Sequence, residues 1–212
     1  MCNYAESSPI RGWGMALGQY FTEPAMVSNQ ARSGRSTKSF IAEGRWATLL
    51  ADVQAGDFVI IQFGHNDEKV NLPKVGTDAA TEFQDNLRRF IREVREKQAT
   101  PVLATPVSRR KFDATGKLVP THGAYPDAIR GVAKAEDVPL LDLERDTAAW
   151  LQAEGVEASK KFFVGLTPGA HPEKPGAVPD NTHFLQAGAE HVAGLAVDEI
   201  RALKLPLVRW LK

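Results

Sequence analysis

A continuous run of apolar residues from Phe58 to Ile61 constrains the fold more than any other feature of this sequence. Such a run is typical of a β-strand that is covered on both faces, and strands of that kind belong to parallel sheets. The expected strand covers residues 57–63, and three further segments are β-prone: residues 25–30, 101–107 and 138–143. The last two each follow a stretch with helical periodicity, so strands and helices alternate along the chain.

Apolar stripes with helical spacing predict the helices that cover this sheet. The stripe on residues 83–94 consists of Phe83, Leu87, Phe90, Ile91 and Val94. Two further helices are predicted at about residues 13–21 and 186–203. Their inward residues are Trp13, Leu17 and Phe21 in the first, and Val192, Leu195, Ala196, Ile200 and Leu203 in the second. Right-handed crossovers then give an α/β fold, a three-layer α/β/α sandwich.

Length and charge balance limit the class of protein. The 212 residues, 43% apolar and 25% charged, suit a single domain over residues 1–212. The 26 basic and 26 acidic residues cancel, which leaves no broad footprint for nucleic acid or an anionic membrane. The single cysteine excludes an internal disulfide, and no apolar run approaches the ~20 residues that cross a bilayer. We expect a soluble protein, with export or a cytoplasmic location and the oligomeric state left open.

Two of the predicted strands are followed by residues that can donate neutral hydrogen bonds. Gly34 comes after the strand predicted at residues 25–30 and can adopt backbone angles that expose its N–H. Asn66 comes after the strand predicted at residues 57–63 and offers a carboxamide. Either residue alone is more simply explained as a turn or capping residue. Together they suit acyl transfer, because one donor to the developing oxyanion is worth ~3 kcal/mol of barrier.

A third candidate site ends a proline- and glycine-rich loop at residues 165–181. Asp180 and His183 are separated by three residues, so the carboxylate can bond Nδ1–H and leave Nε2 free as a general base. A helix-starting Asp and a histidine satisfied in a crevice explain the same residues about as well. A metal site that uses His65, His171 and His183 lacks a recognised ligand spacing, so we expect no metal and no cofactor.

Four blocks of this sequence together resemble the SGNH (GDSL-type) hydrolases, and more narrowly the rhamnogalacturonan acetylesterases. The blocks are Arg11-Gly12-Trp13-Gly14, Gly34-Arg35-Ser36-Thr37-Lys38-Ser39-Phe40 with Glu43-Gly44-Arg45-Trp46, Gly64-His65-Asn66-Asp67, and Asp180-Asn181-Thr182-His183-Phe184. Their order and spacing match nearly end to end. The resemblance implies a flavodoxin-like parallel sheet, the SGNH hydrolase fold.

The resemblance also implies roles for individual residues. Gly34 and Asn66 become oxyanion donors, and Asp180 and His183 become members of a catalytic triad. The residues expected to bind substrate are Arg35, His65 and Asp67.

The family's Gly-Asp-Ser block, whose serine attacks the ester, does not occur in these 212 residues. No other serine or cysteine sits on a strand-to-helix elbow that would present a nucleophile. Residues like Met1 to Tyr4 closely follow that serine in many relatives, so we expect it upstream of Met1. The chain would then be N-terminally truncated and lack the first strand of its sheet. It should be almost inert and unstable when expressed.

The leading functional prediction is a serine esterase that deacetylates pectic rhamnogalacturonan through an acyl-serine intermediate. Its partner would be an acetylated polysaccharide or oligosaccharide. One alternative is a non-catalytic remnant that binds carbohydrate or a protein partner. Another is an SGNH esterase for other small acyl esters.

Overall fold

The structure, a computed structural model, describes residues 1–165 and 180–212. His171 and most of the predicted loop at residues 165–181 lie outside this range. The chain forms two compact units that interleave along the sequence. The helical unit contains residues 1–33, 107–121 and 143–212, and the sheet unit contains residues 34–106 and 122–142. A single domain over residues 1–212 stays a prediction.

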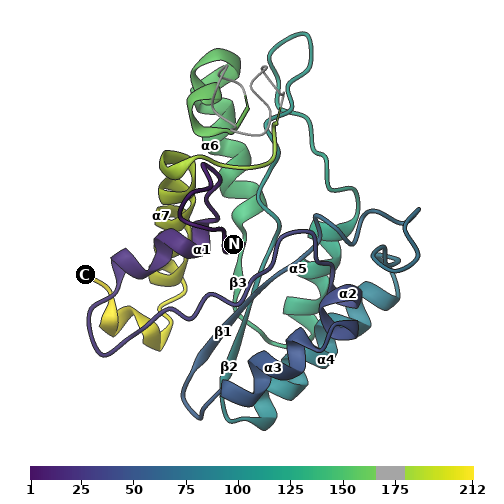
Figure 1. Ribbon diagram of the computed structural model, residues 1–212, viewed down its shortest axis with the longest axis vertical. Helices are drawn as coiled ribbons and strands as arrows, with labels where there is room; N and C mark the ends of the chain where they lie inside the picture. The colour runs from purple at the N-terminus through teal and green to yellow at the C-terminus, as the bar shows by residue number, and fades with distance from the viewer. Residues whose placement is uncertain (166–179) are drawn as a thin grey trace. The chain divides into compact units, whose positions relative to one another are not determined.

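The sheet unit contains a parallel sheet with the strand order β1-β2-β3 (Figure 1). The strands are β1 (Phe58–Gln62), β2 (Thr100–Ala104) and β3 (Leu140–Leu141). Phe58 pairs with Thr100 at one end of β1, and Gln62 pairs with Ala104 at the other. The central strand is buried from Pro101 to Ala104, as expected of a strand covered on both faces. The parallel α/β arrangement predicted from the apolar run is confirmed.

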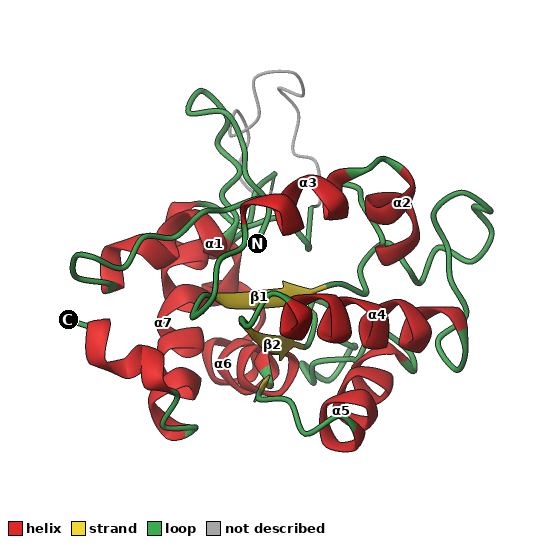
Figure 2. Ribbon diagram, turned by 90° about the horizontal axis from the view of Figure 1, so that it is seen from below, coloured by secondary structure: helices red, strands yellow, loops and turns green. Residues whose placement is uncertain are grey.

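Four helices belong to the sheet unit: α2 (Thr37–Ala42), α3 (Arg45–Asp52), α4 (Glu82–Glu96) and α5 (Tyr125–Ala135). Helix α4 packs on β2, α2 and α5, and Figure 2 shows it running alongside β2. Every residue of its predicted apolar stripe is buried, so that prediction is confirmed. Phe90 lies at the centre of the core, with its ring 4.1 Å from that of Trp46 and 5.7 Å from that of Phe63.

The helical unit is built around its last long helix. Its elements are α1 (Trp13–Ala16), η1 (Leu17–Tyr20), α6 (Leu143–Ala158), η2 (Ser159–Phe162), α7 (Gln186–Ala202) and η3 (Pro206–Trp210), where η marks a 3-10 helix. Helix α7 packs on α1 and α6, and its contact with α1 is visible in Figure 1. Leu203, predicted to face inward, is exposed because α7 ends one residue earlier. None of the helices in the described residues is long and apolar enough to span a membrane.

Residues 25–30 form no strand, which contradicts the prediction from their β-propensity. The end of this segment bonds to the first residues of the chain: the Asn29 side chain donates from Nδ2 to Met1 O at 2.8 Å, and the next residue but one, Ala31, accepts at its O from Asn3 N–H at 3.0 Å. The Met26 side chain is 91% exposed. A β-prone sequence needs a pleated, half-buried surface to pack on. Within the described part of the helical unit no strand supplies one.

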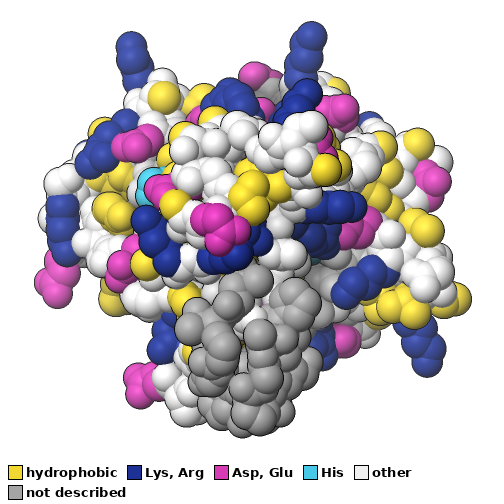
Figure 3. Space-filling view, turned by 90° about the horizontal axis from the view of Figure 1, so that it is seen from above, with side chains coloured by type: hydrophobic (Ala, Val, Ile, Leu, Met, Phe, Trp, Pro, Cys, Tyr) yellow, Lys and Arg dark blue, Asp and Glu magenta, His cyan; other side chains and the backbone are white. Residues whose placement is uncertain are grey.

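Charged side chains of both signs are interspersed on the face of the protein drawn in Figure 3. This distribution agrees with the equal numbers of basic and acidic residues, 26 each.

Replacing Phe90 with Ala should lower the free energy of unfolding by about 3–5 kcal/mol, because the core around α4 cannot fully collapse onto the cavity. Urea denaturation followed by circular dichroism measures this change. The matched control is Arg92→Ala on the same helix, where the side chain is 63% exposed. The control should change stability by less than about 0.5 kcal/mol. Equal losses in the two variants would contradict the described packing of α4.

Candidate active site

Gly34 begins the turn that leads into α2. Its φ of 78° lies in the left-handed region that favours glycine, and a Cβ added there would meet no atom within 4 Å. Ser36 caps α2: its Oγ accepts from Ser39 N at 3.1 Å, and its N–H donates to Ser39 Oγ at 2.9 Å. Among the described residues no acceptor is bonded to the Gly34 N–H. This N–H is therefore not used by the described part of the chain.

Asn66 lies in the same unit against the Gly34 turn. Its Nδ2 donates to Arg35 O at 3.2 Å, while Lys69 Nζ donates to its Oδ1 at 2.7 Å. The lysine fixes which end of the carboxamide carries the donor, and that end faces the turn. The sheet unit thus brings the two predicted oxyanion donors close together. The Asn66 nitrogen carries a second N–H that can serve a ligand.

Asp67 is fully buried and receives four hydrogen bonds. Its Oδ1 accepts from Thr37 N at 2.9 Å, Thr37 Oγ1 at 2.6 Å and Thr77 Oγ1 at 3.1 Å, and its Oδ2 accepts from Gly64 N at 3.1 Å. Burial raises the pKa of Asp67, and the hydrogen bonds from Thr37, Gly64 and Thr77 offset part of that rise. The carboxylate joins the start of α2 to the turn before Asn66. The substrate-binding role that the sequence predicts for Asp67 stays a prediction.

His65 and Arg35, the other predicted substrate-binding residues, are half-buried in the sheet unit. The His65 ring stands edge-on to that of His122, with the centroids 4.4 Å apart. His122 Nδ1 lies 3.0 Å from Glu68 Oε2. Arg35 Nε contacts both carboxylate oxygens of Glu43, at 3.0 and 3.1 Å. Both side chains are held by neighbours and reach the surface, and their contact with substrate stays a prediction.

Asp180 and His183 form a hydrogen-bonded pair in the helical unit. Asp180 Oδ2 lies 2.7 Å from His183 Nδ1, and Oδ1 accepts from the backbone N–H groups of Thr182 and His183, each at 2.9 Å. Burial raises the pKa of Asp180, but the hydrogen bonds from His183 and Thr182 outweigh it, so the pKa lies below its ordinary value. With Nδ1 engaged, Nε2 is the nitrogen left to move a proton.

The surroundings of this pair include a residue that the sequence analysis missed. The Tyr4 ring stands edge-on to the His183 ring, with the centroids 6.4 Å apart. Tyr4 OH donates to Ser33 Oγ at 3.4 Å. Burial raises the pKa of Tyr4 to about 12, so its hydroxyl stays protonated beside the pair. Only the folded chain places Tyr4 there, since 179 positions separate it from His183.

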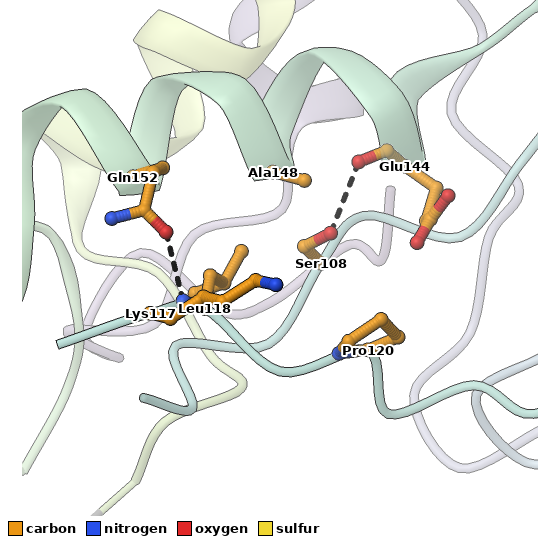
Figure 4. Close-up of a pocket in the computed structure, with 7 residues that line it drawn as sticks. All are labelled: Ser108, Lys117, Leu118, Pro120, Glu144, Ala148 and Gln152. Carbon is orange, nitrogen blue, oxygen red and sulfur yellow. Dashed lines mark hydrogen bonds between the residues drawn. The ribbon is translucent and has the colours of Figure 1, made fainter. Parts of the chain in front are cut away.

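A pocket of about 170 Å³ in the helical unit does not contain the candidate site. Its lining residues, drawn in Figure 4, are Ser108, Lys117, Leu118, Pro120, Glu144, Ala148 and Gln152. Ser108 Oγ donates to Glu144 O at 3.0 Å, and Gln152 Oε1 accepts from Leu118 N at 2.8 Å. These contacts hold the pocket wall together, and none of the predicted site residues takes part in the lining.

Each unit therefore carries one of the predicted pairs. The sheet unit holds Gly34 and Asn66, and the helical unit holds Asp180 and His183. Their joint action on one ester stays a prediction.

Comparison with known proteins identifies the family. A profile of the GDSL-like Lipase/Acylhydrolase family matches residues 3–190. The chain belongs to this family. Its members hydrolyse carboxylic esters, and the predicted family resemblance is confirmed.

Two relatives from Bacillus subtilis (strain 168) match almost the whole chain. The chain is 44% identical over 200 residues to the rhamnogalacturonan acetylesterase RhgT, a match that covers 94% of this chain and 84% of that protein. It is 34% identical over 204 residues to YesY, named a probable rhamnogalacturonan acetylesterase, with 96% of this chain and 89% of that protein covered.

Solved structures confirm the SGNH hydrolase fold. The crystal structure of YxiM from Bacillus subtilis has a TM-score of 0.83 and 28% identity, and it covers 97% of this chain. This chain spans 55% of that longer protein. The acetylxylan esterase Axe2 from Geobacillus stearothermophilus has a TM-score of 0.63 and 20% identity over 94% of this chain and 88% of that chain. At that identity the likeness concerns the fold alone.

In this GDSL-family chain, Asp67→Asn should lower the free energy of unfolding by about 1–3 kcal/mol at neutral pH. The new amide group would place a donor against the Gly64 N–H, so one buried donor loses its acceptor. Urea denaturation measures the loss, and the exposed Asp85→Asn is the matched control. A variant as stable as the wild type would show that the four contacts of Asp67 do not hold the two turns.

The lowered pKa of Asp180 predicts acid sensitivity of the helical unit. A carboxylate with a lowered folded pKa contributes stability above its unfolded pKa of about 3.9, and this contribution is lost as the pH falls through the folded value. Asp180→Asn should therefore reduce the loss of stability across this window, with thermal melts at several pH values as the measurement. An equal loss of thermal stability with falling pH in both proteins would contradict the pairing.

Proposed function

We propose that this protein is a serine esterase that removes acetyl groups from pectic rhamnogalacturonan. The observation that supports it most is the 2.7 Å contact between Asp180 and His183, in a chain 44% identical to a rhamnogalacturonan acetylesterase. Acyl transfer needs a base with a fixed tautomer, and a carboxylate at Nδ1 supplies it.

The proposed reaction proceeds in two steps. His183 Nε2 takes the proton of the family's Gly-Asp-Ser serine as its oxygen attacks the acetyl carbonyl carbon. The imidazolium then protonates the departing sugar oxygen, and a water molecule releases acetate by the reverse sequence of proton transfers. Asp180 stays ionised and stabilises the imidazolium. The serine itself has no residue number in these 212 residues.

The two sheet-unit donors would stabilise the tetrahedral intermediate. The Gly34 N–H and the Asn66 carboxamide are uncharged, so they favour the oxyanion over the ground-state carbonyl without trapping a carboxylate product. Arg35 and His65 are proposed to contact the sugar chain. Arg35 would bind a galacturonate carboxylate, because a guanidinium can form two parallel hydrogen bonds to a carboxylate.

The experiment that tests this function measures acetate release from acetylated rhamnogalacturonan. It compares the 212-residue chain with a version preceded by a Gly-Asp-Ser segment of the family. In the version with the serine, His183→Ala should lower turnover by a factor on the order of 10⁶. Asn66→Ala should lower it by about 10²–10³-fold. Arg92→Ala, on the exposed side of α4, is the control and should leave turnover unchanged.

Three results would overturn the proposal. Undiminished turnover in His183→Ala would remove the proposed base. Efficient cleavage of simple aryl esters combined with no acetate release from the pectic substrate would indicate an esterase for other small acyl esters. No hydrolysis of any ester together with retained binding to the polysaccharide would favour the non-catalytic alternative.

A further inference from the structure

A buried arginine holds the turn that carries Asp180 and His183. Arg110 is 7% exposed and lies in the helical unit. Its Nη1 donates to Asn181 Oδ1 at 3.0 Å, and its backbone N–H donates to Asn181 O at 2.9 Å. One residue therefore binds Asn181 through both its side chain and its main chain. Asn181 directly follows Asp180, so this contact restrains the turn at its first step.

The remaining donors of Arg110 reach the end of α6. Its Nε donates to Ser159 Oγ at 2.9 Å, and its Nη2 donates to Val156 O. Helix α6 departs from helical geometry at Gly155, where φ is 75°, and Ser159 Oγ donates to Gly155 O at 2.6 Å. A planar guanidinium with donors in fixed directions thus joins the irregular end of α6 to the turn.

The segment that carries Arg110 is itself fixed on α6. Ser108 N–H donates to Thr147 Oγ1 at 2.9 Å, and Ser108 Oγ bonds to Glu144 O. Farther along, Gln152 accepts from Leu118 N–H, a contact drawn in Figure 4 together with the one between Ser108 and Glu144. The backbone around Arg110 is therefore tied to α6 on both sides.

The chemistry of the Arg110 site points to a geometric role. Within residues 1–165 and 180–212, the acceptors that its guanidinium bonds are all uncharged: a carboxamide oxygen, a hydroxyl and a backbone carbonyl. Burial lowers the pKa of Arg110, while the charge of Glu157 raises it. Burying a cation without a bonded carboxylate costs free energy that an apolar side chain of similar volume avoids. A residue that only filled this space would not need the charge or the fork of donors.

We propose that Arg110 is a positioning residue that keeps the Asp180 carboxylate on His183 Nδ1. Arg110 fixes the turn at Asn181, and Val164 N–H fixes its other end by donating to His183 O at 2.9 Å. With both ends held, the Asp180 carboxylate is kept within hydrogen-bond distance of the imidazole, 2.7 Å from Nδ1. The catalytic consequence rests on the proposed function, whereas the geometric one does not.

The test follows the His183 imidazole directly by NMR, without any need for catalysis. The protein is labelled on histidine, and His183→Gln assigns the signal among the five histidines. The wild type should show a slowly exchanging low-field Nδ1–H resonance. Arg110→Gln and Arg110→Lys should both lose it, because neither side chain offers the same fork of donors.

The matched control is Arg95→Gln. Arg95 Nη2 also donates to backbone carbonyls, those of Glu136 at 2.7 Å and Asp137 at 3.3 Å, but in the sheet unit. This variant should keep the His183 signal. Asn181→Ala is the second variant in case Arg110→Gln does not fold, because it removes only the Oδ1 acceptor and keeps the backbone contact. It should weaken the same Nδ1–H signal.

Kinetics on the version that carries the serine give the second readout. Arg110→Lys should lower kcat by up to about 10²-fold with little change in KM, as expected when a catalytic group is misplaced. A retained Nδ1–H signal in Arg110→Lys and Asn181→Ala would overturn the inference. Loss of the signal without any esterase activity in the wild type would instead support the positioning role and count against the proposed function.

Discussion

The turns that carry Gly34 and Asn66 depend on one buried carboxylate, that of Asp67. The four hydrogen bonds to Asp67 come from Thr37 at the start of α2, from Gly64 after β1 and from Thr77 in a loop. Tyr125 of α5 adds a bond from its hydroxyl to Asp67 O at 3.1 Å. Because a buried charge must keep its donors, these loops cannot move independently. The turns that carry Gly34 and Asn66 therefore take their positions from a buried side chain.

In the helical unit, the buried cation of Arg110 joins separate segments, as the Asp67 carboxylate does in the sheet unit. Arg110 spreads its charge over neutral acceptors on α6, η2 and the Asp180 turn, whereas Asp67 collects neutral donors. In both cases a buried charge binds groups that belong to separate segments and makes their separation costly. Preorganised donors and bases are what acyl transfer requires, since dipoles that must reorient during reaction stabilise the transition state less.

Features that depend on residues close together in the sequence could be predicted, and features that depend on distant residues could not. The stripe on α4 and the apolar run of β1 were predicted because burial imposes a period on neighbouring residues. The Asp180–His183 pair was predicted because its members are three positions apart. Residues 25–30 failed because a strand requires a partner that their own sequence does not encode. The positioning role of Asp67 was missed because its contact with Thr37 spans 30 positions, and that of Arg110 because its contact with Asn181 spans 71.

The exposure of the Asp180–His183 pair explains why such support is needed. The Asp180 and His183 side chains are 25% and 40% exposed, so both can be reached from solvent. An ion pair this close to solvent is screened and contributes little orientation by attraction alone. The tautomer of His183 must therefore be held by directional bonds, namely those from Thr182 and His183 N–H to the carboxylate and the restraint that Arg110 places on Asn181. The Asp180–His183 pair is thus partly exposed, whereas Arg110, which holds its turn, is buried.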